Sequence, residues 1–104
     1  MVARGDVWWL EAPEHKRRPV LVLTRDAAIP VRRKTCVAPL TTRVRGIPVE
    51  VALSRLDDGV TEDCVISLDN VETVPKAFLV EKMTTLSTVR MAEVCAALAT
   101  AIDC

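Results

Sequence analysis

The sequence predicts a mainly β protein: a small, strongly bent barrel that carries one helix at its C-terminal end. The first observation is a series of short apolar runs rich in β-branched residues, separated by proline, glycine and charged residues. The second is a change of apolar period after Ser87, from strand-like runs to the spacing of an amphipathic helix. The length of 104 residues favours a single domain over residues 1–104.

The first half of the chain is predicted to alternate strands with polar loops. The expected strands cover residues 7–10, 20–24, 35–38 and 49–53, and the loops between them cover 12–17, 27–34 and 43–48. Pro19 fits the first position of the second strand, where a missing N–H is tolerated. Pro39 is expected to stop the third strand, because proline cannot donate a hydrogen bond to the sheet.

The second half continues in the same style before the period changes. Asp57-Asp58-Gly59 predicts a turn, residues 64–68 a strand, and residues 71–74 its extension past a bend at 69–70. One helical turn is expected at 75–78 and a last short strand at 79–84. Ser87 is the expected N-cap of the final helix. The apolar face of that helix is predicted to comprise Met91, Val94, Cys95, Leu98 and Ile102.

Net charge is zero, but the charges are divided between the two halves. Residues 1–46 hold ten Lys/Arg and four Asp/Glu (+6), whereas residues 47–104 hold four and ten (−6). This asymmetry indicates an anionic partner for the first half, unless the two halves pair on the folded surface. Neither a membrane-length apolar run nor a secretory signal is recognisable, so a cytoplasmic protein without membrane attachment is expected.

The composition gives no indication of a metal or cofactor. His15 is the only histidine, and the four cysteines are widely spread without a C-x-x-C spacing, so we predict no metal site. Cys36, Cys64 and Cys95 lie among apolar residues and are expected to be buried, while the terminal Cys104 is expected to be exposed.

Several loop residues could bind a phosphate. Lys16-Arg17-Arg18 runs directly into the strongest strand, where an arginine can clamp a phosphate, although a solvated loop or an ion pair is the simpler interpretation. Thr41 and Thr42, followed by Arg43 and Arg45, offer hydroxyls beside cations, or ordinary turn chemistry. The run Arg32-Arg33-Lys34 adds three cations to the loop before the third strand. Glu14-His15 could transfer a proton.

These segments, in this order, resemble MazF/PemK-type toxins over nearly the whole chain. The resemblance is carried by Arg4-Gly5-Asp6-Val7-Trp8-Trp9, Arg18-Pro19-Val20-Leu21-Val22-Leu23, Val37-Ala38-Pro39-Leu40-Thr41-Thr42, Gly46-Ile47-Pro48-Val49-Glu50-Val51, Asp63-Cys64-Val65-Ile66-Ser67-Leu68-Asp69-Asn70-Val71 and the helix start Leu86-Ser87 with Met91-Ala92-Glu93-Val94.

The resemblance implies an SH3-like barrel, a homodimer, and a metal-free, ribosome-independent endoribonuclease neutralised by a cognate antitoxin. Such enzymes cut single-stranded RNA at short sequences, leaving a 2′,3′-cyclic phosphate and a 5′-hydroxyl, with messenger, transfer and ribosomal RNA as alternative substrates. The family's catalytic Arg and Thr correspond to Arg18 and Thr41. The Gly-Ser-Glu loop of many members is replaced here, which leaves Glu14 as a match for the loop acid and His15 as a candidate base or acid.

Two other functions are compatible with the sequence. The same fold occurs in gyrase-poisoning toxins, which act by binding a protein, and fold does not determine function. A barrel that binds RNA without cutting it is the other alternative. Arg18 with Thr41, together with the basic first half, favours the nuclease over both.

Overall fold

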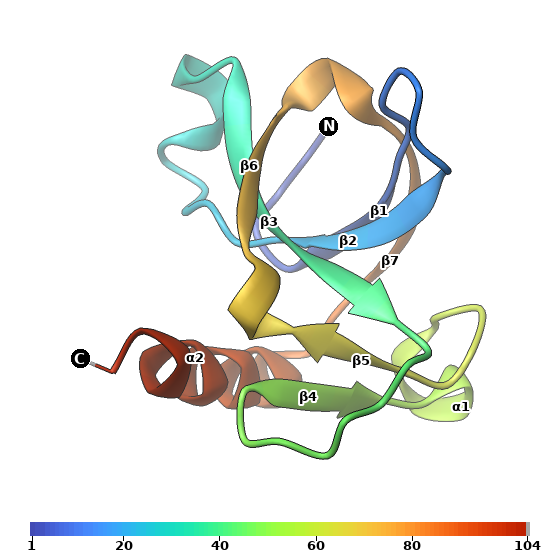
Figure 1. Ribbon diagram of the computed structural model, residues 1–104. Coiled ribbons are helices and arrows are strands. Elements are labelled where there is room, and N and C mark those ends of the chain that lie inside the picture. The colour runs from blue at the N-terminus through green and yellow to red at the C-terminus, as the bar shows by residue number, and fades with distance from the viewer. Residues whose placement is uncertain (104) are drawn as a thin grey trace.

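The computed structural model describes residues 1–103, which form a bent antiparallel sheet with a helix against one side (Figure 1). Its strands are β1 (Asp6–Leu10), β2 (Arg18–Val22), β3 (Lys34–Thr41), β4 (Glu50–Leu53), β5 (Cys64–Ser67), β6 (Glu72–Pro75) and β7 (Leu79–Thr85). The helices are α1 (Arg55–Asp58) and α2 (Thr88–Ile102), with short 3-10 turns at Ile29–Val31, Leu68–Asn70 and Lys76–Phe78.

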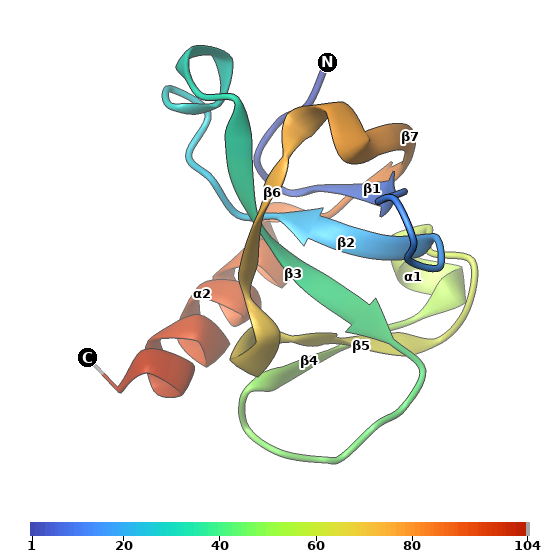
Figure 2. The same cartoon turned by 45° about the horizontal axis from the view of Figure 1, so that its top comes forward.

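Strand β3 organises the sheet. The order across the sheet is β4-β5-β3-β2-β1-β7, and β6 also pairs with β3. Along one edge of β3, β6 pairs with its first half and β5 with its end (Figures 1 and 2). Among the described strands, β4 and β7 each have one partner, so the sheet is not closed. The mainly β fold with a C-terminal helix is confirmed, with an open rather than a closed barrel.

The sheet has an apolar core on each side, because side chains alternate along β2 and β3. Leu21, Ala38 and Leu40 belong to the core that includes residues of α2, β4 and β5. Val20, Val22 and Val37 belong to a second core, whose other buried members are Leu10, Ile29, Val74 and Leu79. Two-sided burial explains why these strands read as continuous apolar runs rather than as alternating ones.

The prediction that Pro39 ends the third strand is wrong: β3 continues to Thr41. Leu23 N donates to Cys36 O at 2.9 Å, so these two residues form a hydrogen-bonded pair. Pairs alternate along an antiparallel ladder, so Pro39 and its partner Val20 form a non-hydrogen-bonded pair. The nitrogen of Pro39 therefore faces the other edge of β3, between the end of the β6 pairing and the start of the β5 pairing. Proline costs no hydrogen bond there.

Two further details differ from the predicted elements. The segment after β5 does not extend that strand, because the Leu68–Asn70 turn redirects the chain and β6 pairs independently with β3. The turn predicted at 57–59 ends α1, with Gly59 in the left-handed region at φ 74°. The remaining strands, the turn at Lys76–Phe78 and the terminal helix occupy the predicted segments to within a few residues.

The apolar face of α2 is rotated from the predicted one. Val94 is buried and Met91 and Leu98 pack against the core, as predicted, but Cys95 and Ile102 are exposed. Small alanines at 97 and 101 fill the inward positions instead, since they allow the helix to approach the sheet closely. Ser87 caps the helix as predicted, its Oγ accepting from Arg90 N at 3.1 Å.

Of the remaining cysteines, Cys64 is buried as predicted, Cys36 is half-buried, and Cys104 lies outside the described residues. Within residues 1–103, no helix is long and apolar enough to cross a membrane.

Candidate active site

Arg18 and Thr41 lie at the ends of two neighbouring strands, Arg18 at the start of β2 and Thr41 at the end of β3. The pairing of β2 with β3 ends at Val20 and Pro39, and beyond this pair the two strands diverge (Figures 1 and 2). Because side chains alternate along a strand, Arg18 projects to the face of Val20 and Thr41 to the face of Val37, and both valines are buried in the second core. An arginine and a hydroxyl thus lie at the rim of an apolar core.

A cleft of about 650 Å³ opens at this rim. Of the predicted site residues, it is lined by Arg18, Thr41, Arg43 and Arg45. Its other lining residues are Pro39, Ser67, Asp69, Asn70, Val71 and Glu72. The lining therefore holds three arginines and two carboxylates, a composition suited to an anionic ligand that also engages polar groups.

Arg18 forms an ion pair with Glu72, through one terminal nitrogen of the guanidinium and one carboxylate oxygen. Glu72 begins β6 and lies opposite Val37 in the register of β3 and β6, so it shares the face of Arg18 and Thr41. The Arg18 side chain is 44% exposed and that of Glu72 37%. The pair is therefore accessible to a ligand in the cleft.

Hydroxyl and amide groups complete the floor of the cleft. Thr41 Oγ1 accepts from Arg43 N at 3.1 Å, which leaves its O–H hydrogen free to donate to a ligand. Ser67 is buried at 3% exposure and accepts from Asn70 Nδ2 at 2.8 Å. The turn after β5 thereby holds Asn70 and its neighbour Asp69 at the edge of the cleft.

The loop after β3 is anchored by Glu50. The Glu50 carboxylate accepts from Arg45 N at 3.0 Å, Gly46 N at 2.9 Å and Arg45 Nε at 3.3 Å. Desolvation alone would raise the pKa of Glu50, but these hydrogen bonds outweigh it and lower the pKa below its ordinary value. Arg45 also lies 3.8 Å from Asp69, whereas the Arg43 guanidinium has no ion pair within residues 1–103.

The loop before Arg18 does not reach the cleft. Arg17 is adjacent to Arg18 in sequence, but its guanidinium stacks 4.9 Å from the centroid of the Trp9 ring and pairs with Glu81 on β7. Lys16, Glu14 and His15 are exposed and do not line the cleft. The structure thus brings Arg18 into the cleft without the other four predicted residues of this loop.

The remaining predicted residues lie outside the cleft as well. Thr42 follows β3, is exposed and does not line it. Lys34 begins β3, eight residues long, and Arg32 and Arg33 precede it. At about 3.3 Å per residue, Lys34 lies ~23 Å from Thr41 along the strand. No group of three or more His, Cys, Asp or Glu side chains in residues 1–103 is arranged to hold a metal ion.

Comparison with known proteins gives the family. A family model described as PemK-like, MazF-like toxin of type II toxin–antitoxin systems matches residues 3–102. The chain belongs to this PemK/MazF-like toxin family. The resemblance found in the sequence is therefore confirmed.

PemK/MazF-like relatives match the chain along almost its whole length. The probable endoribonuclease MazF5 of Mycobacterium tuberculosis H37Rv is 48% identical over 102 residues, which cover 98% of this chain and 94% of the relative. The solved structure of the M. tuberculosis toxin MazF-mt6 has a TM-score of 0.85 at 32% identity, covering 94% of this chain and 96% of that one. A mycobacterial endoribonuclease in complex with its cognate antitoxin has a TM-score of 0.88 at 25% identity, covering 99% and 96%.

Sequence reasoning missed the lining residues at and after the end of β5. Ser67 ends this buried strand, and Asp69, Asn70 and Glu72 follow it to form a polar group. The sequence shows that these polar residues adjoin the strand, but no local sequence pattern shows that β6 pairs with β3. The pairing of Glu72 with Arg18, 54 positions apart, depends on this topology.

Proposed function

We propose that this chain, like the relatives named endoribonucleases, is an endoribonuclease toxin that cuts single-stranded RNA within the cleft. The proposal is supported above all by the presence of Arg18 and Thr41 in one cleft, which Arg43 and Arg45 also line. The 2′-hydroxyl of the RNA attacks the neighbouring phosphorus, giving a 2′,3′-cyclic phosphate and a 5′-hydroxyl.

The groups of the cleft suit the charge that this reaction develops. Attack on phosphorus places negative charge on the phosphoryl oxygens, which preorganised donors stabilise. Arg18 offers five N–H donors in a planar fork, and the Thr41 hydroxyl donates from the end of β3. Arg43 and Arg45 bind adjacent phosphates. Lys16, Arg17, Arg32, Arg33, Lys34 and Thr42 are proposed to contact the RNA further from the cut.

The reaction requires no divalent metal in this proposal. The nucleophile is the substrate's own hydroxyl, so no metal-activated water is needed. Cleavage should proceed in EDTA, and an RNA with a 2′-deoxy sugar at the cut position should remain intact. Strict dependence on added magnesium, or cleavage of the deoxy-substituted strand, would contradict this mechanism.

The direct test is Arg18→Ala, assayed on single-stranded RNA with end-group analysis. Loss of a donor to the transition state should lower the cleavage rate about 10²–10³-fold, and Thr41→Ala should lower it less. Arg55→Ala is the matched control, because Arg55 is an arginine of α1 that does not line the cleft. If Arg18→Ala cuts at the wild-type rate, the cleft is not the active site. If it abolishes cleavage but still arrests growth, a protein-binding toxin of the gyrase-poison type is favoured.

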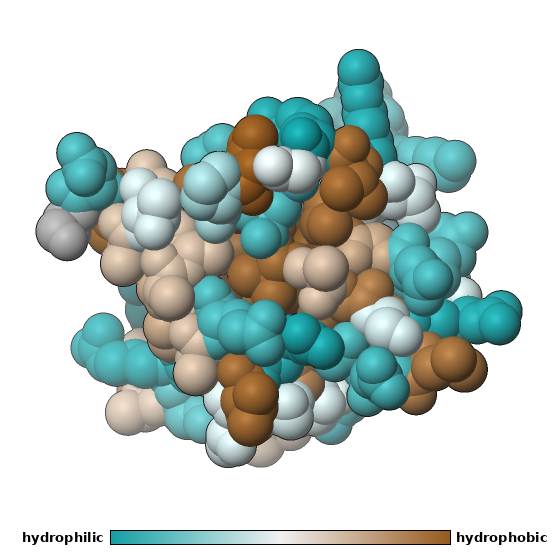
Figure 3. All heavy atoms as spheres, turned by 90° about the horizontal axis from the view of Figure 1, so that it is seen from below, coloured by the Kyte–Doolittle hydropathy of each residue, from teal (hydrophilic) through white to brown (hydrophobic). Residues whose placement is uncertain are grey.

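The family also supports a proposed biological assembly. We propose one domain over residues 1–104, a homodimer in the cytoplasm, and a cognate antitoxin with a flexible acidic segment that covers the basic cleft. Seen from below, apolar side chains reach the surface on the face of β4 and α2, which suits an interface between subunits (Figure 3). Co-expression with the neighbouring small open reading frame tests the antitoxin. Failure of this neighbour either to rescue growth or to co-purify would contradict it.

A further inference from the structure

The proposed reaction needs a proton acceptor that Arg18 and Thr41 cannot provide. The 2′-hydroxyl must lose its proton as it attacks phosphorus. An arginine side chain stays protonated in proteins, and a threonine hydroxyl is far too weak a base. The sequence suggests Glu14 or His15 for proton transfer, but neither lines the cleft. This inference rests on the proposed function and concerns the group that takes the proton.

Two carboxylates line the cleft, and they differ in their partners. Asp69 lies on the turn after β5, 3.8 Å from the Arg45 guanidinium. Glu72 lies on β6 and pairs directly with Arg18, the residue proposed to hold the reacting phosphate. The 2′-hydroxyl of an RNA is attached next to that phosphate, so the carboxylate beside Arg18 is the better placed of the two.

The ion pair leaves both partners with capacity for substrate. Arg18 uses one terminal nitrogen toward Glu72 and has no other hydrogen-bond partner for its guanidinium within residues 1–103. Its remaining N–H groups can bind a phosphoryl oxygen. Glu72 uses Oε1 toward Arg18, and Oε2 has no partner among the described residues. An RNA phosphate held by these N–H groups would therefore share the Arg18 guanidinium with the Glu72 carboxylate, whose Oε2 is free to accept a proton.

We propose that Glu72 is the general base of the cleavage reaction. Glu72 Oε2 takes the proton from the 2′-hydroxyl, and the bond from O2′ to phosphorus forms as the bond from phosphorus to O5′ breaks. The departing O5′ takes a proton from water, which completes the 5′-hydroxyl product. Arg18 then has two tasks: it stabilises charge on the phosphoryl group and it orients the carboxylate.

The test is Glu72→Gln, measured under single-turnover conditions across a range of pH. Glutamine retains the size of the side chain and an oxygen that accepts from Arg18, but it cannot take a proton. The cleavage rate should fall about 10²–10⁴-fold. A general base predicts that the wild-type rate declines toward acid pH (the acid limb of the pH profile), and this decline should be absent in the variant. Glu72→Asp keeps a carboxylate and should keep the acid limb at a reduced rate.

Glu81→Gln is the matched control. Glu81 also pairs with an arginine, Arg17, and is also exposed, but it lies outside the cleft. It should cleave at the wild-type rate, and both Glu→Gln variants should bind an all-deoxy substrate analogue as the wild type does. A wild-type rate and acid limb in Glu72→Gln would overturn the inference. So would loss of the acid limb in Glu14→Gln or His15→Ala instead.

The outcomes also separate this inference from the proposed function. A wild type that cuts RNA while Glu72→Gln is unaffected defeats the role of Glu72 alone. A wild type that binds RNA without cutting it defeats both. If Glu72→Gln loses its rate together with binding of the deoxy analogue, Glu72 organises the cleft for binding, and the general-base role is wrong.

Discussion

Asp6 shows how a single buried carboxylate is stabilised at the entrance to β1. The residue is 2% exposed, and its oxygens accept from Thr85 Oγ1 at 2.8 Å, Trp8 Nε1 at 3.2 Å and Ala3 N at 3.0 Å. Lys82 lies 3.5 Å away. Burial alone would raise the pKa of Asp6, but these hydrogen bonds and the charge of Lys82 outweigh it and lower the pKa below 3.8.

This lowered pKa predicts a pH dependence of stability. A carboxylate with a folded pKa below its unfolded pKa stabilises the protein above the unfolded value, and the contribution is lost as pH falls through the folded value. Asp6→Asn should therefore be less stable than the wild type at neutral pH, and the difference should shrink at acid pH below about 4. Urea unfolding of both proteins across pH measures this. A difference that stays constant with pH would show that Asp6 acts through packing alone.

Residues differ in how much of their role the sequence reveals. Arg18 and Thr41 could be predicted because each sits at the end of an apolar strand, within motifs that resemble a family. Glu72 could not, because its place beside Arg18 depends on β6 pairing with β3. Cys95 has an apolar neighbourhood in sequence but lies on the exposed side of α2, 3.4 Å from the guanidinium of Arg4. Local composition does not determine the rotation of a helix.

At the scale of elements, the sequence predicts where the strands lie, but it does not predict where each strand ends or which strands it pairs with. Runs of β-branched residues locate β2, β3 and β5 because burial on both faces requires them. The extension of β3 past Pro39 cannot be predicted locally. Proline is tolerated there because neither β6 nor β5 pairs with Pro39 on that edge of β3, and this depends on the placement of two other strands. That extension matters for function, because it carries Thr41 to the cleft.

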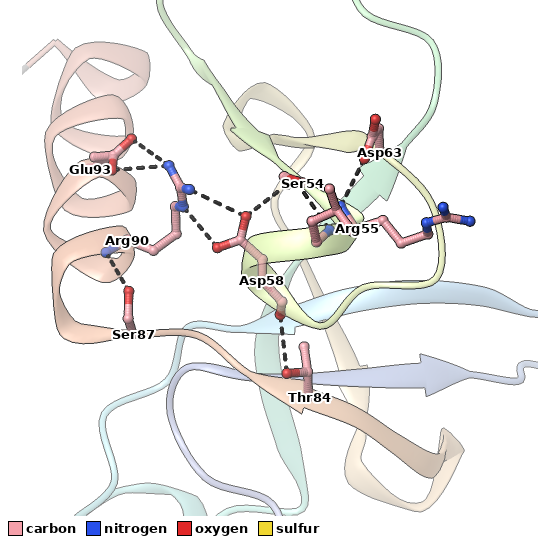
Figure 4. A network of polar contacts seen from close by, with 9 residues as sticks. Ser54, Arg55, Asp58, Asp63, Thr84, Ser87, Arg90 and Glu93 are labelled. Atoms are coloured by element: carbon pink, nitrogen blue, oxygen red, sulfur yellow. Dashed lines mark hydrogen bonds and ion pairs between the residues drawn. The ribbon is translucent and has the colours of Figure 1, made fainter.

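Arg90 joins the two helices at the end of the sheet. Figure 4 shows its guanidinium reaching from α2 to Asp58 of α1, whose backbone carbonyl accepts from Thr84 on β7. The Arg90 contacts to Asp58 are 3.1 and 3.2 Å, and the Asp58 side chain is only 6% exposed. Asp58 also accepts from Ser54 N at 2.7 Å, which caps the start of α1.

Removal of this guanidinium should destabilise the protein. Arg90→Met keeps the apolar stem but leaves the Asp58 carboxylate without its charged donor, which should cost about 1–3 kcal/mol. Arg55→Met is the control, because the Arg55 side chain makes no ion pair in residues 1–103. The measurement is the urea midpoint with an unchanged slope. Equal midpoints for the two variants would mean that the pair contributes no more than a surface contact.

At the scale of the whole molecule, the charge separation along the sequence is partly neutralised by folding. Arg17, Arg18 and Arg45 of the basic half pair with Glu81, Glu72 and Glu50 of the acidic half. Within residues 1–103, however, Arg32, Arg33, Lys34 and Arg43 make no ion pair. Pairing of the two halves therefore accounts for some of the charges, and an anionic partner remains available to the others. These four cations can bind an RNA backbone without giving up an ion pair, whereas Arg17, Arg18 and Arg45 would bind it while they are paired.

These cations lie at the two ends of β3, and this separation leads to a prediction about RNA length. Each phosphate contact adds about 0.7 to the slope of log K against log salt for a single strand. Arg32/Arg33/Lys34→Ala should lower the slope by about 2, and Arg43→Ala by about 0.7, on an RNA long enough to reach both ends. On an oligonucleotide that covers only the cleft, Arg43→Ala should keep its effect while the triple variant should match the wild type. Salt titrations of binding with both RNAs measure the slopes. An effect of the triple variant on the short RNA would mean that the strand runs elsewhere, and an unchanged slope on the long RNA would mean that these residues are only solvated.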